Sequence, residues 1–169
     1  MLVDEALNHY RPNVGVVLFN RRAEVFIGRR IGAFEIAGES AGLLGWQFPQ
    51  GGVDKDEDIA AAAFRELKEE TGVTSARLLT LTPGWIAYDF PFEYAKHGWR
   101  GQRQKWAAML FEGDDAEIDL EADAHQEFDA WRWAALEEAP DLIVPFKREV
   151  YREIVRAFTP LRDFIRAAA

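Results

Sequence analysis

Three glutamates lie within one helical turn of each other in the middle of the chain: Glu66, Glu69 and Glu70. At spacings of three and four residues on a helix, their carboxylates come within a few ångströms of each other, which destabilises a helix unless a positive group lies between them. Oxygen ligands without His or Cys suit a hard divalent cation such as Mg²⁺ better than zinc. The spacing therefore points to a magnesium site, although by itself it is also typical of a solvated helix face.

A longer motif surrounds these glutamates between residues 51 and 73. It has the form G-x5-E-x7-R-E-U-x-E-E-x-G-U, where U is an aliphatic residue. All of its positions are filled, by Gly51, Glu57, Arg65, Glu66, Leu67, Glu69, Glu70, Gly72 and Val73. This is the Nudix box, so the chain resembles the Nudix hydrolases, and a motif of this length is far more specific than a lone glycine pattern.

The resemblance implies that Glu66, Glu69 and Glu70 bind Mg²⁺ or Mn²⁺, two or three ions with substrate bound. Arg65 is expected to orient a carboxylate by ion pairing. Glu57 is expected to support the motif through hydrogen bonds.

Outside the box, the resemblance narrows to one branch of the family. The matching segments, in the same order, are YRPNVG (10–15), WQFPQGG (46–52), QRQKW (102–106), EFDAWRW (127–133) and PFKREVY (145–151). Together they resemble bacterial RNA 5′-pyrophosphohydrolases, also described as (di)nucleoside polyphosphate hydrolases. The likeness extends from about Tyr10 to Phe158 and implies a Nudix-type α/β/α sandwich with a mixed β-sheet and a loop-helix-loop catalytic motif.

These segments carry further candidate site residues. The resemblance implies that Glu127 joins the helix glutamates at the metal ions, and that the backbone carbonyl of Gln50 or Gly51 is another ligand. Candidate substrate contacts are four cations and one aromatic residue: Arg11, Arg30, Lys105 and Lys147 for phosphates, and Phe146 for stacking on a base. Each of the five also has an ordinary interpretation as a surface charge or a core side chain.

The expected reaction is metal-dependent hydrolysis of a phosphoanhydride bond in a nucleotide polyphosphate. Glu70, Glu69 or Glu127 would accept a proton from the attacking water, and the sequence does not choose among them. Two substrates fit: the triphosphorylated 5′ end of RNA, which would lose pyrophosphate, and dinucleoside polyphosphates such as diadenosine tetraphosphate. The alternative from another class is a catalytically silent nucleotide-sensing module, which typically lacks box residues that are present here.

The glutamates need a helix to position them, and one is predicted from about Asp56 to Thr71, with Gly72 as its C-terminal cap. The spacing of a core-facing stripe is followed by Ala60, Ala63, Phe64 and Leu67. The three glutamates are predicted to crowd another face of the same helix.

Strands are predicted around this helix, at 14–20 and 24–30 as a hairpin, and at 76–82, 85–88, 104–112 and 127–133. A second helix is predicted from 145 to about 157, with its core stripe formed by Phe146, Val150, Ile154 and Ala157. This order of elements favours an α+β fold over a doubly wound parallel one. Residues 31–45 and 94–101 are predicted loops, longer than in shorter members of the branch, that border the substrate site.

The composition limits the classes of function. With 169 residues, 49% of them apolar, the chain is expected to form a single domain over 1–169. A net charge of −9 argues against broad binding of duplex DNA, and the absence of cysteine excludes disulfides and thiolate chemistry. No membrane segment or leader is apparent, so a cytoplasmic location is expected. Four tryptophans are predicted to be core residues: Trp46, Trp106, Trp131 and Trp133. The histidines receive no role, and the oligomeric state is left open.

Overall fold

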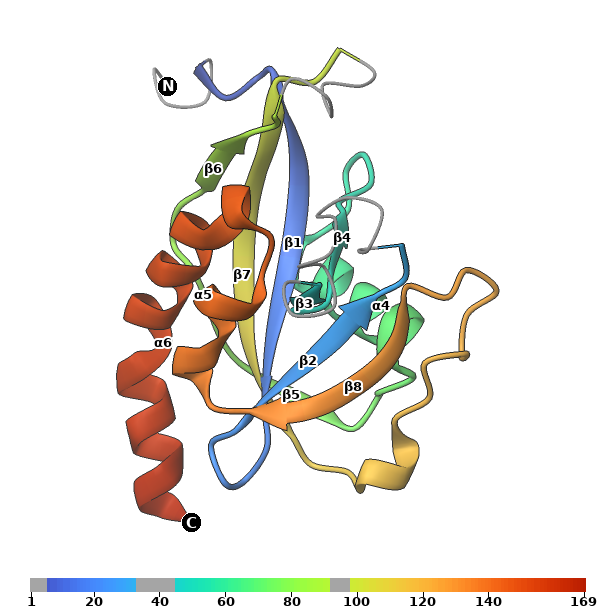
Figure 1. The fold of residues 1–169 in the computed structure, drawn as a ribbon, viewed down its shortest axis with the longest axis vertical. Coiled ribbons are helices and arrows are strands. Elements are labelled where there is room, and N and C mark those ends of the chain that lie inside the picture. Colours follow the sequence, from blue (N-terminus) through green and yellow to red (C-terminus); the bar gives the residue numbers. More distant parts are fainter. Residues whose placement is uncertain (1–5, 33–44, 92–97) are drawn as a thin grey trace.

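The computed structural model describes residues 6–32, 45–91 and 98–169. Within these ranges, eight strands form one mixed sheet (Figure 1). The strands are β1 (Tyr10–Phe19), β2 (Val25–Arg30), β3 (Trp46–Gln47), β4 (Gln50–Gly52), β5 (Ala76–Leu81), β6 (Ile86–Asp89), β7 (Gly101–Phe111) and β8 (Phe128–Ala134). The helices are α4 (Ile59–Thr71), α5 (Ala139–Leu142) and α6 (Arg148–Ala168), with 3-10 turns η3 (Asp115–Glu117), η4 (Leu136–Glu138) and η5 (Pro145–Lys147).

The sheet is built around β1 and β7, which run parallel from Tyr10↔Gly101 to Phe19↔Leu110. The predicted hairpin of β1 and β2 is confirmed, but its antiparallel pairing is recorded only at Phe19↔Val25. Beyond this point β2 pairs with β8, and β1 pairs with β4 instead. The two strands therefore diverge, as Figure 1 shows, and β4 lies beside the part of β1 that β2 leaves.

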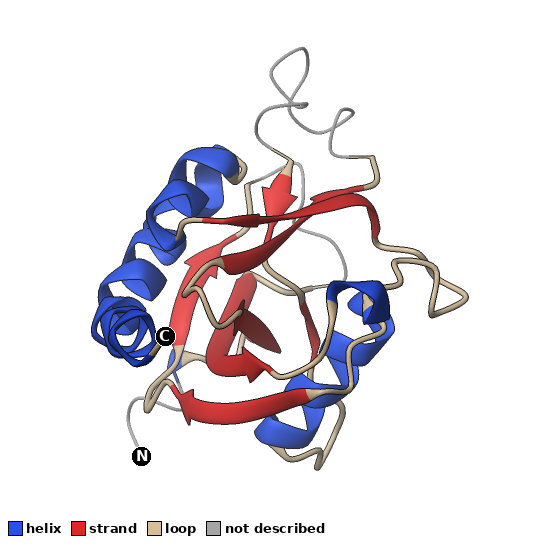
Figure 2. Ribbon diagram, turned by 90° about the horizontal axis from the view of Figure 1, so that it is seen from below, coloured by secondary structure: helices blue, strands red, loops and turns tan. Residues whose placement is uncertain are grey.

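Two hydrophobic cores lie on opposite faces of the sheet. One packs α6 against the sheet through Val150, Tyr151 and Ile154. The other packs α4 through Ala63 and Leu67. Figure 2 shows the two helices on either side of the strands. The predicted α+β class and α/β/α layering are thus confirmed. None of the described helices combines the length and the apolar character that crossing a bilayer requires.

The predicted strands are all present, but two begin earlier than expected. β1 begins at Tyr10 rather than Val14, and β7 begins at Gly101 rather than Gln104. The extra residues are mostly polar, and their backbones pair with each other in parallel register. Hydrophobic periodicity does not detect strand ends of this kind.

Helix α4 differs from the prediction in its start and in its buried face. It begins at Ile59, because the carboxylate of Asp58 caps it by accepting a hydrogen bond from the Ala61 N–H at 3.0 Å. Gly72 ends it in the left-handed region at φ 73°, as predicted. Phe64, placed in the core stripe by its spacing, is 37% exposed. The inward face is rotated away from it, which brings two of the glutamates inward.

Helix α6 is longer than predicted and follows a separate 3-10 turn at Pro145–Lys147. Ala157 is exposed, and Phe158 takes its expected place in the core. The helix continues past Pro160, so the proline does not end it. Near its start, the hydroxyl of Tyr151 accepts a hydrogen bond from the Phe48 N–H at 2.9 Å, and the two rings stack. This contact fixes the segment that leads into β4.

Candidate active site

Carboxylates from separate parts of the chain converge on a cavity of about 430 Å³ between β1, β4, α4 and the start of β8. Its charged lining consists of Glu66, Glu69, Glu70, Glu127, Asp123, Arg11 and Arg30. The remaining lining residues are Asn13, Gln50, Gly51, Gly52, Gln102 and His125. Four glutamates therefore share one solvent-accessible space.

The helix glutamates do not all lie on a face separate from the core-facing side, contrary to the prediction. Glu66 and Glu70 are only 8% and 7% exposed, and they lie beside Leu67 on the inward side of α4. Glu69 remains partly exposed. Helix α4 packs beside β4, and the cavity lies between them. The carboxylates on the inward face of α4 therefore line this cavity.

Glu70 is the most deeply placed of these carboxylates. Its Oε2 accepts a hydrogen bond from the Gln50 N–H at 3.1 Å, which joins α4 to β4. Burial raises the pKa of Glu70 well above its usual range, and the nearby charges of Glu127 and Glu66 raise it further. A positive charge in the cavity would relieve this repulsion.

Arg65 links the helix to the loop before it. Its guanidinium donates to both carboxylate oxygens of Glu57, at 2.7 and 2.9 Å, and to the carbonyl oxygen of Gly52 at 2.9 Å. It also donates to Glu66 at 2.7 Å and approaches Glu69 at 3.4 Å. The hydrogen bonds from Arg65 lower the pKa of Glu57 to about 2. Glu57 itself does not line the cavity, so its contact with the site runs through Arg65.

Gly51 is required by the close approach of the helix to β4. A Cβ atom at this position would lie 2.0 Å from the carboxyl carbon of Glu66. Only glycine leaves room for that carboxylate. The backbone of β4 and the carboxylates of α4 therefore line the same wall of the cavity.

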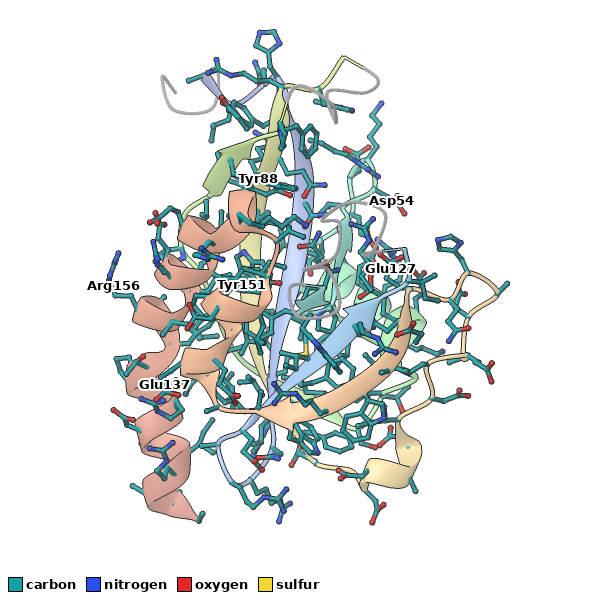
Figure 3. The ribbon with its side chains drawn as sticks, in the orientation of Figure 1. Asp54, Tyr88, Glu127, Glu137, Tyr151 and Arg156 are labelled. Atoms are coloured by element: carbon teal, nitrogen blue, oxygen red, sulfur yellow. The ribbon has the colours of Figure 1, made fainter. Side chains whose placement is uncertain are left out.

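Glu127 reaches the cavity from the other side. It immediately precedes β8, and Figure 3 shows its side chain beside the end of β2. Its carboxylate lies 3.3 Å from the Nε of Arg30 and 3.8 Å from the Nε2 of His125. Its negative charge adds to burial in raising the pKa of Glu70.

The donor set of the cavity suits a hard divalent cation. It offers carboxylate, amide and backbone oxygens, with His125 as the one nitrogen ligand in its lining. Among the described residues, no three acidic or histidine side chains are grouped to hold an ion as they stand. Arg65 holds Glu66, and Arg30 holds Glu127. The residues present fit a magnesium site.

Two of the five predicted substrate contacts line the cavity, and the other three do not. Arg11 and Arg30 line the cavity. Lys147 is buried, and this burial, together with the charge of Arg30, lowers its pKa to about 8. Glu127 and Glu70 raise the same pKa, so the ammonium lies within electrostatic reach of the site. Phe146 is half-buried, with its ring 6.1 Å from that of Tyr88.

The placement of Lys105 differs from the prediction. Its ammonium lies 5.0 Å from the centre of the Trp85 ring, and it is not part of the cavity lining. The reason is strand alternation, because successive side chains point to opposite faces of a sheet. Gln102, which lines the cavity, and Gln104 share one face of β7, so Lys105 faces the other way.

Sequence reasoning missed four polar residues of the cavity lining: Asn13, Gln102, Asp123 and His125. The Gln104 side chain donates to the amide oxygen of Asn13 at 2.9 Å, and the Tyr88 hydroxyl donates to Gln102 at 2.6 Å. A signal for two of them was available, because Asn13 and Gln102 lie in polar stretches at the starts of β1 and β7. No comparable signal marks Asp123 and His125, which lie in an irregular segment before β8.

Comparison with known proteins gives consistent matches. Residues 9–154 match the NUDIX domain family. An RNA pyrophosphohydrolase of Caulobacter vibrioides is 58% identical over 154 residues, which cover 88% of this chain and 86% of that protein. An RNA pyrophosphohydrolase of Acidiphilium cryptum is 49% identical over 152 residues, covering 88% of this chain and 90% of that protein.

Solved structures resemble the fold at lower sequence identity. A C. elegans Ap4A hydrolase in a binary complex aligns with a TM-score of 0.56 and 20% identity, covering 88% of this chain and 98% of the other. The E. coli dihydroneopterin triphosphate pyrophosphohydrolase aligns with a TM-score of 0.62 and 17% identity, with the same coverage. At these identities, the likeness concerns the fold alone.

Proposed function

Since this chain belongs to the NUDIX domain family and its relatives include RNA pyrophosphohydrolases, we propose that it removes pyrophosphate from the triphosphorylated 5′ end of RNA. Dinucleoside polyphosphates are the second substrate class, because they also present a nucleotide next to a phosphate chain. The relatives named above as RNA pyrophosphohydrolases favour the RNA end as the better substrate. Their similarity extends over most of both chains.

One observation carries the proposal: four glutamates and two arginines line a single cavity. The arginines supply bidentate donors for phosphate oxygens. The glutamates supply the oxygen ligands that Mg²⁺ or Mn²⁺ prefers. A polyphosphate needs both kinds of group, since it is itself too negative to approach bare carboxylates.

We assign Glu66, Glu69, Glu70 and Glu127, with a carbonyl of β4, to metal binding. Magnesium held there would supply charge neutralisation and an activated water. Arg65 positions Glu66 through their 2.7 Å contact. One of the buried or partly buried glutamates accepts the proton of the attacking water, and Glu70, Glu69 and Glu127 all stand at suitable positions.

We assign the nucleotide end of the substrate to the region around η5, whose Phe146 and Lys147 lie outside the cavity lining. Lys147 places an ammonium within electrostatic reach of Arg30, where a phosphate would attract both cations. Phe146 and Tyr88 lie next to each other in this part of the molecule, and Phe146 is partly accessible for stacking on a base. Arg11, on β1, lines the cavity, and we assign it to the phosphate chain.

The test is a side-by-side measurement of kcat/KM for triphosphorylated RNA and for diadenosine tetraphosphate, with purified protein and Mg²⁺. We expect both to be cleaved and the RNA to give the larger value. A larger value for diadenosine tetraphosphate would reassign the substrate within the same chemistry. Binding of either ligand without any hydrolysis would support the sensing module and overturn the proposal.

A further inference from the structure

Two consecutive arginines at the end of β2 each contact a different carboxylate near the start of β8. Arg29 contacts Asp129 at 2.7 Å, and Arg30 contacts Glu127 at 3.3 Å. The β2–β8 register shifts between Arg29 and Arg30, and such bulges redirect side chains. A backbone hydrogen bond from the Ile31 N–H to the Glu127 carbonyl, at 2.9 Å, holds the end of the pairing. The contact between Arg30 and Glu127 is thus set by the backbone.

The two pairs differ in their surroundings. Asp129 and Arg29 do not line the cavity, whereas Arg30 and Glu127 both do. The side chains of Arg30 and Glu127 are 43% and 23% exposed, so solvent and ligands can reach them. Arg30 therefore faces two competing anions in one space: a carboxylate that we assign to metal binding and the phosphates that we assign to the substrate.

We propose that Arg30 is a positioning residue that withholds Glu127 from the metal ions until a substrate phosphate takes over its guanidinium. A guanidinium pairs with a phosphate through the same two-pronged geometry as with a carboxylate, so the exchange keeps Arg30 partnered. Glu127 then loses its cation and becomes available as a ligand. This inference rests on the proposed function, because it requires an anionic phosphate chain and divalent ions at this cavity.

The exchange makes phosphate and metal binding cooperative beyond their direct attraction. A bound phosphate releases Glu127 and so raises the affinity for the metal ion. A bound metal ion raises the affinity for phosphate by the same factor. The alternative is that Arg30 is only a phosphate contact. In that case its charge acts on metal ions in the same general way as that of any other cavity arginine.

Arg11 provides the matched control for this difference. It lines the same cavity and carries the same charge, but no ion pair with a carboxylate is recorded for it within the described residues. Replacing either arginine with glutamine removes one positive charge from the site. Only Arg30→Gln also frees Glu127.

The experiment is titration of the purified protein with Mn²⁺ in the absence of nucleotide, with free Mn²⁺ followed by electron paramagnetic resonance. We expect Arg30→Gln to tighten Mn²⁺ binding about threefold more than Arg11→Gln, the size expected for one partly exposed ion pair. In the Glu127→Gln background, Arg30→Gln should tighten Mn²⁺ binding no more than Arg11→Gln does; the Glu127→Gln single variant completes the double-mutant cycle. Circular dichroism verifies that each variant is folded.

Equal effects of Arg30→Gln and Arg11→Gln would overturn the inference, as would an excess over Arg11→Gln that persists in the Glu127→Gln background. Hydrolysis of triphosphorylated RNA by the wild type is measured in parallel. Normal hydrolysis with equal effects of the two substitutions refutes the exchange alone. Absence of both hydrolysis and Mn²⁺ binding refutes the proposed function itself.

Discussion

At the scale of single residues, the site is defined by how its charges are paired. Glu57 and Glu66 share the Arg65 guanidinium, and Glu127 has Arg30. Glu70 has a backbone hydrogen bond from Gln50 but no cation of its own among the described contacts. Glu70 is therefore the carboxylate that gains most from a metal ion.

Replacing Glu70 with glutamine should lower kcat for triphosphorylated RNA by at least about 100-fold. The fold should not suffer. Burial raises the pKa of Glu70, so its ionised form disfavours the folded state, and this cost grows as pH rises above the unfolded pKa of a glutamate. At pH 7 without metal, the variant should unfold at the same temperature as the wild type or higher. Near-normal turnover in a folded variant would refute this role.

Lys147 gives a second prediction, because its pKa is lowered to about 8 from a usual 10.5. The folded state releases this proton before the unfolded state does, so the stability of the wild type should rise between pH 8 and pH 10.5. Lys147→Met should lack this rise and should be more stable at pH 7, on the order of 1 kcal/mol. Thermal unfolding of both proteins across this pH range measures the difference. A parallel pH dependence in the two would contradict the burial of the charge.

Binding should follow the same group in the opposite direction. The ammonium of Lys147 attracts phosphate only while it is protonated, so KM for RNA should rise as pH increases through about 8. In Lys147→Met, KM should be higher at pH 7 and less dependent on pH. Steady-state kinetics of the wild type and of Lys147→Met from pH 7 to pH 9 provide the measurement.

At the scale of elements, the site depends on how closely α4 approaches β4. The helix and its cap at Gly72 were predictable from spacing and capping signals, and the glutamates with them. Which face of the helix is buried was not predictable, because the spacing of Phe64 and of the alanines fits more than one core-facing stripe. Packing against β1 decided the rotation, and it buried Glu66 and Glu70 in place of Phe64.

Gly51→Ala tests this approach. An added Cβ would fall on the carboxyl group of Glu66 and must displace it, so kcat should fall by about 10- to 100-fold. Gly84→Ala is the matched control, since a Cβ there meets nothing within 4 Å and its φ is not positive. Equal activity of both variants would show that Glu66 need not lie against β4.

The sites on strands show the same limit of sequence reasoning. Glu127 could be proposed from the resemblance of its segment, and the structure places it in the cavity. Lys105 was proposed from its segment as well, but alternation along β7 turns it toward Trp85. Applying that alternation together with the β1–β7 register would have selected Gln102 instead. The register, however, is known only from the fold.

At the scale of the whole molecule, a net charge of −9 surrounds a site for a polyanion. We therefore assign the phosphate contacts to three cations, Arg11 and Arg30 in the cavity lining and the buried Lys147. We expect such a protein to bind a few phosphates at one end of an RNA and not to coat the rest. The composition argued only against broad binding of duplex DNA, whereas the positions of the cations required the structure.

The salt dependence of catalysis should reflect the small number of phosphate contacts. For about three contacts to a single strand, raising monovalent salt from about 50 to about 200 mM should lower kcat/KM for RNA by no more than about 20-fold. Measurement at constant Mg²⁺ separates this effect from competition for the metal site. A loss of about 1,000-fold would indicate a much longer RNA-binding surface than the described cations provide.

The central claim is that converging glutamates hold divalent ions that make a phosphoanhydride bond open to hydrolysis. The most direct measurement is product analysis of triphosphorylated RNA incubated with the purified protein, first with Mg²⁺, then after chelation, and again after the metal is restored. We predict 5′-monophosphorylated RNA with Mg²⁺, none after chelation, and recovery when the ion returns. Cleavage that is insensitive to chelation, or no cleavage under any of these conditions, would contradict the account.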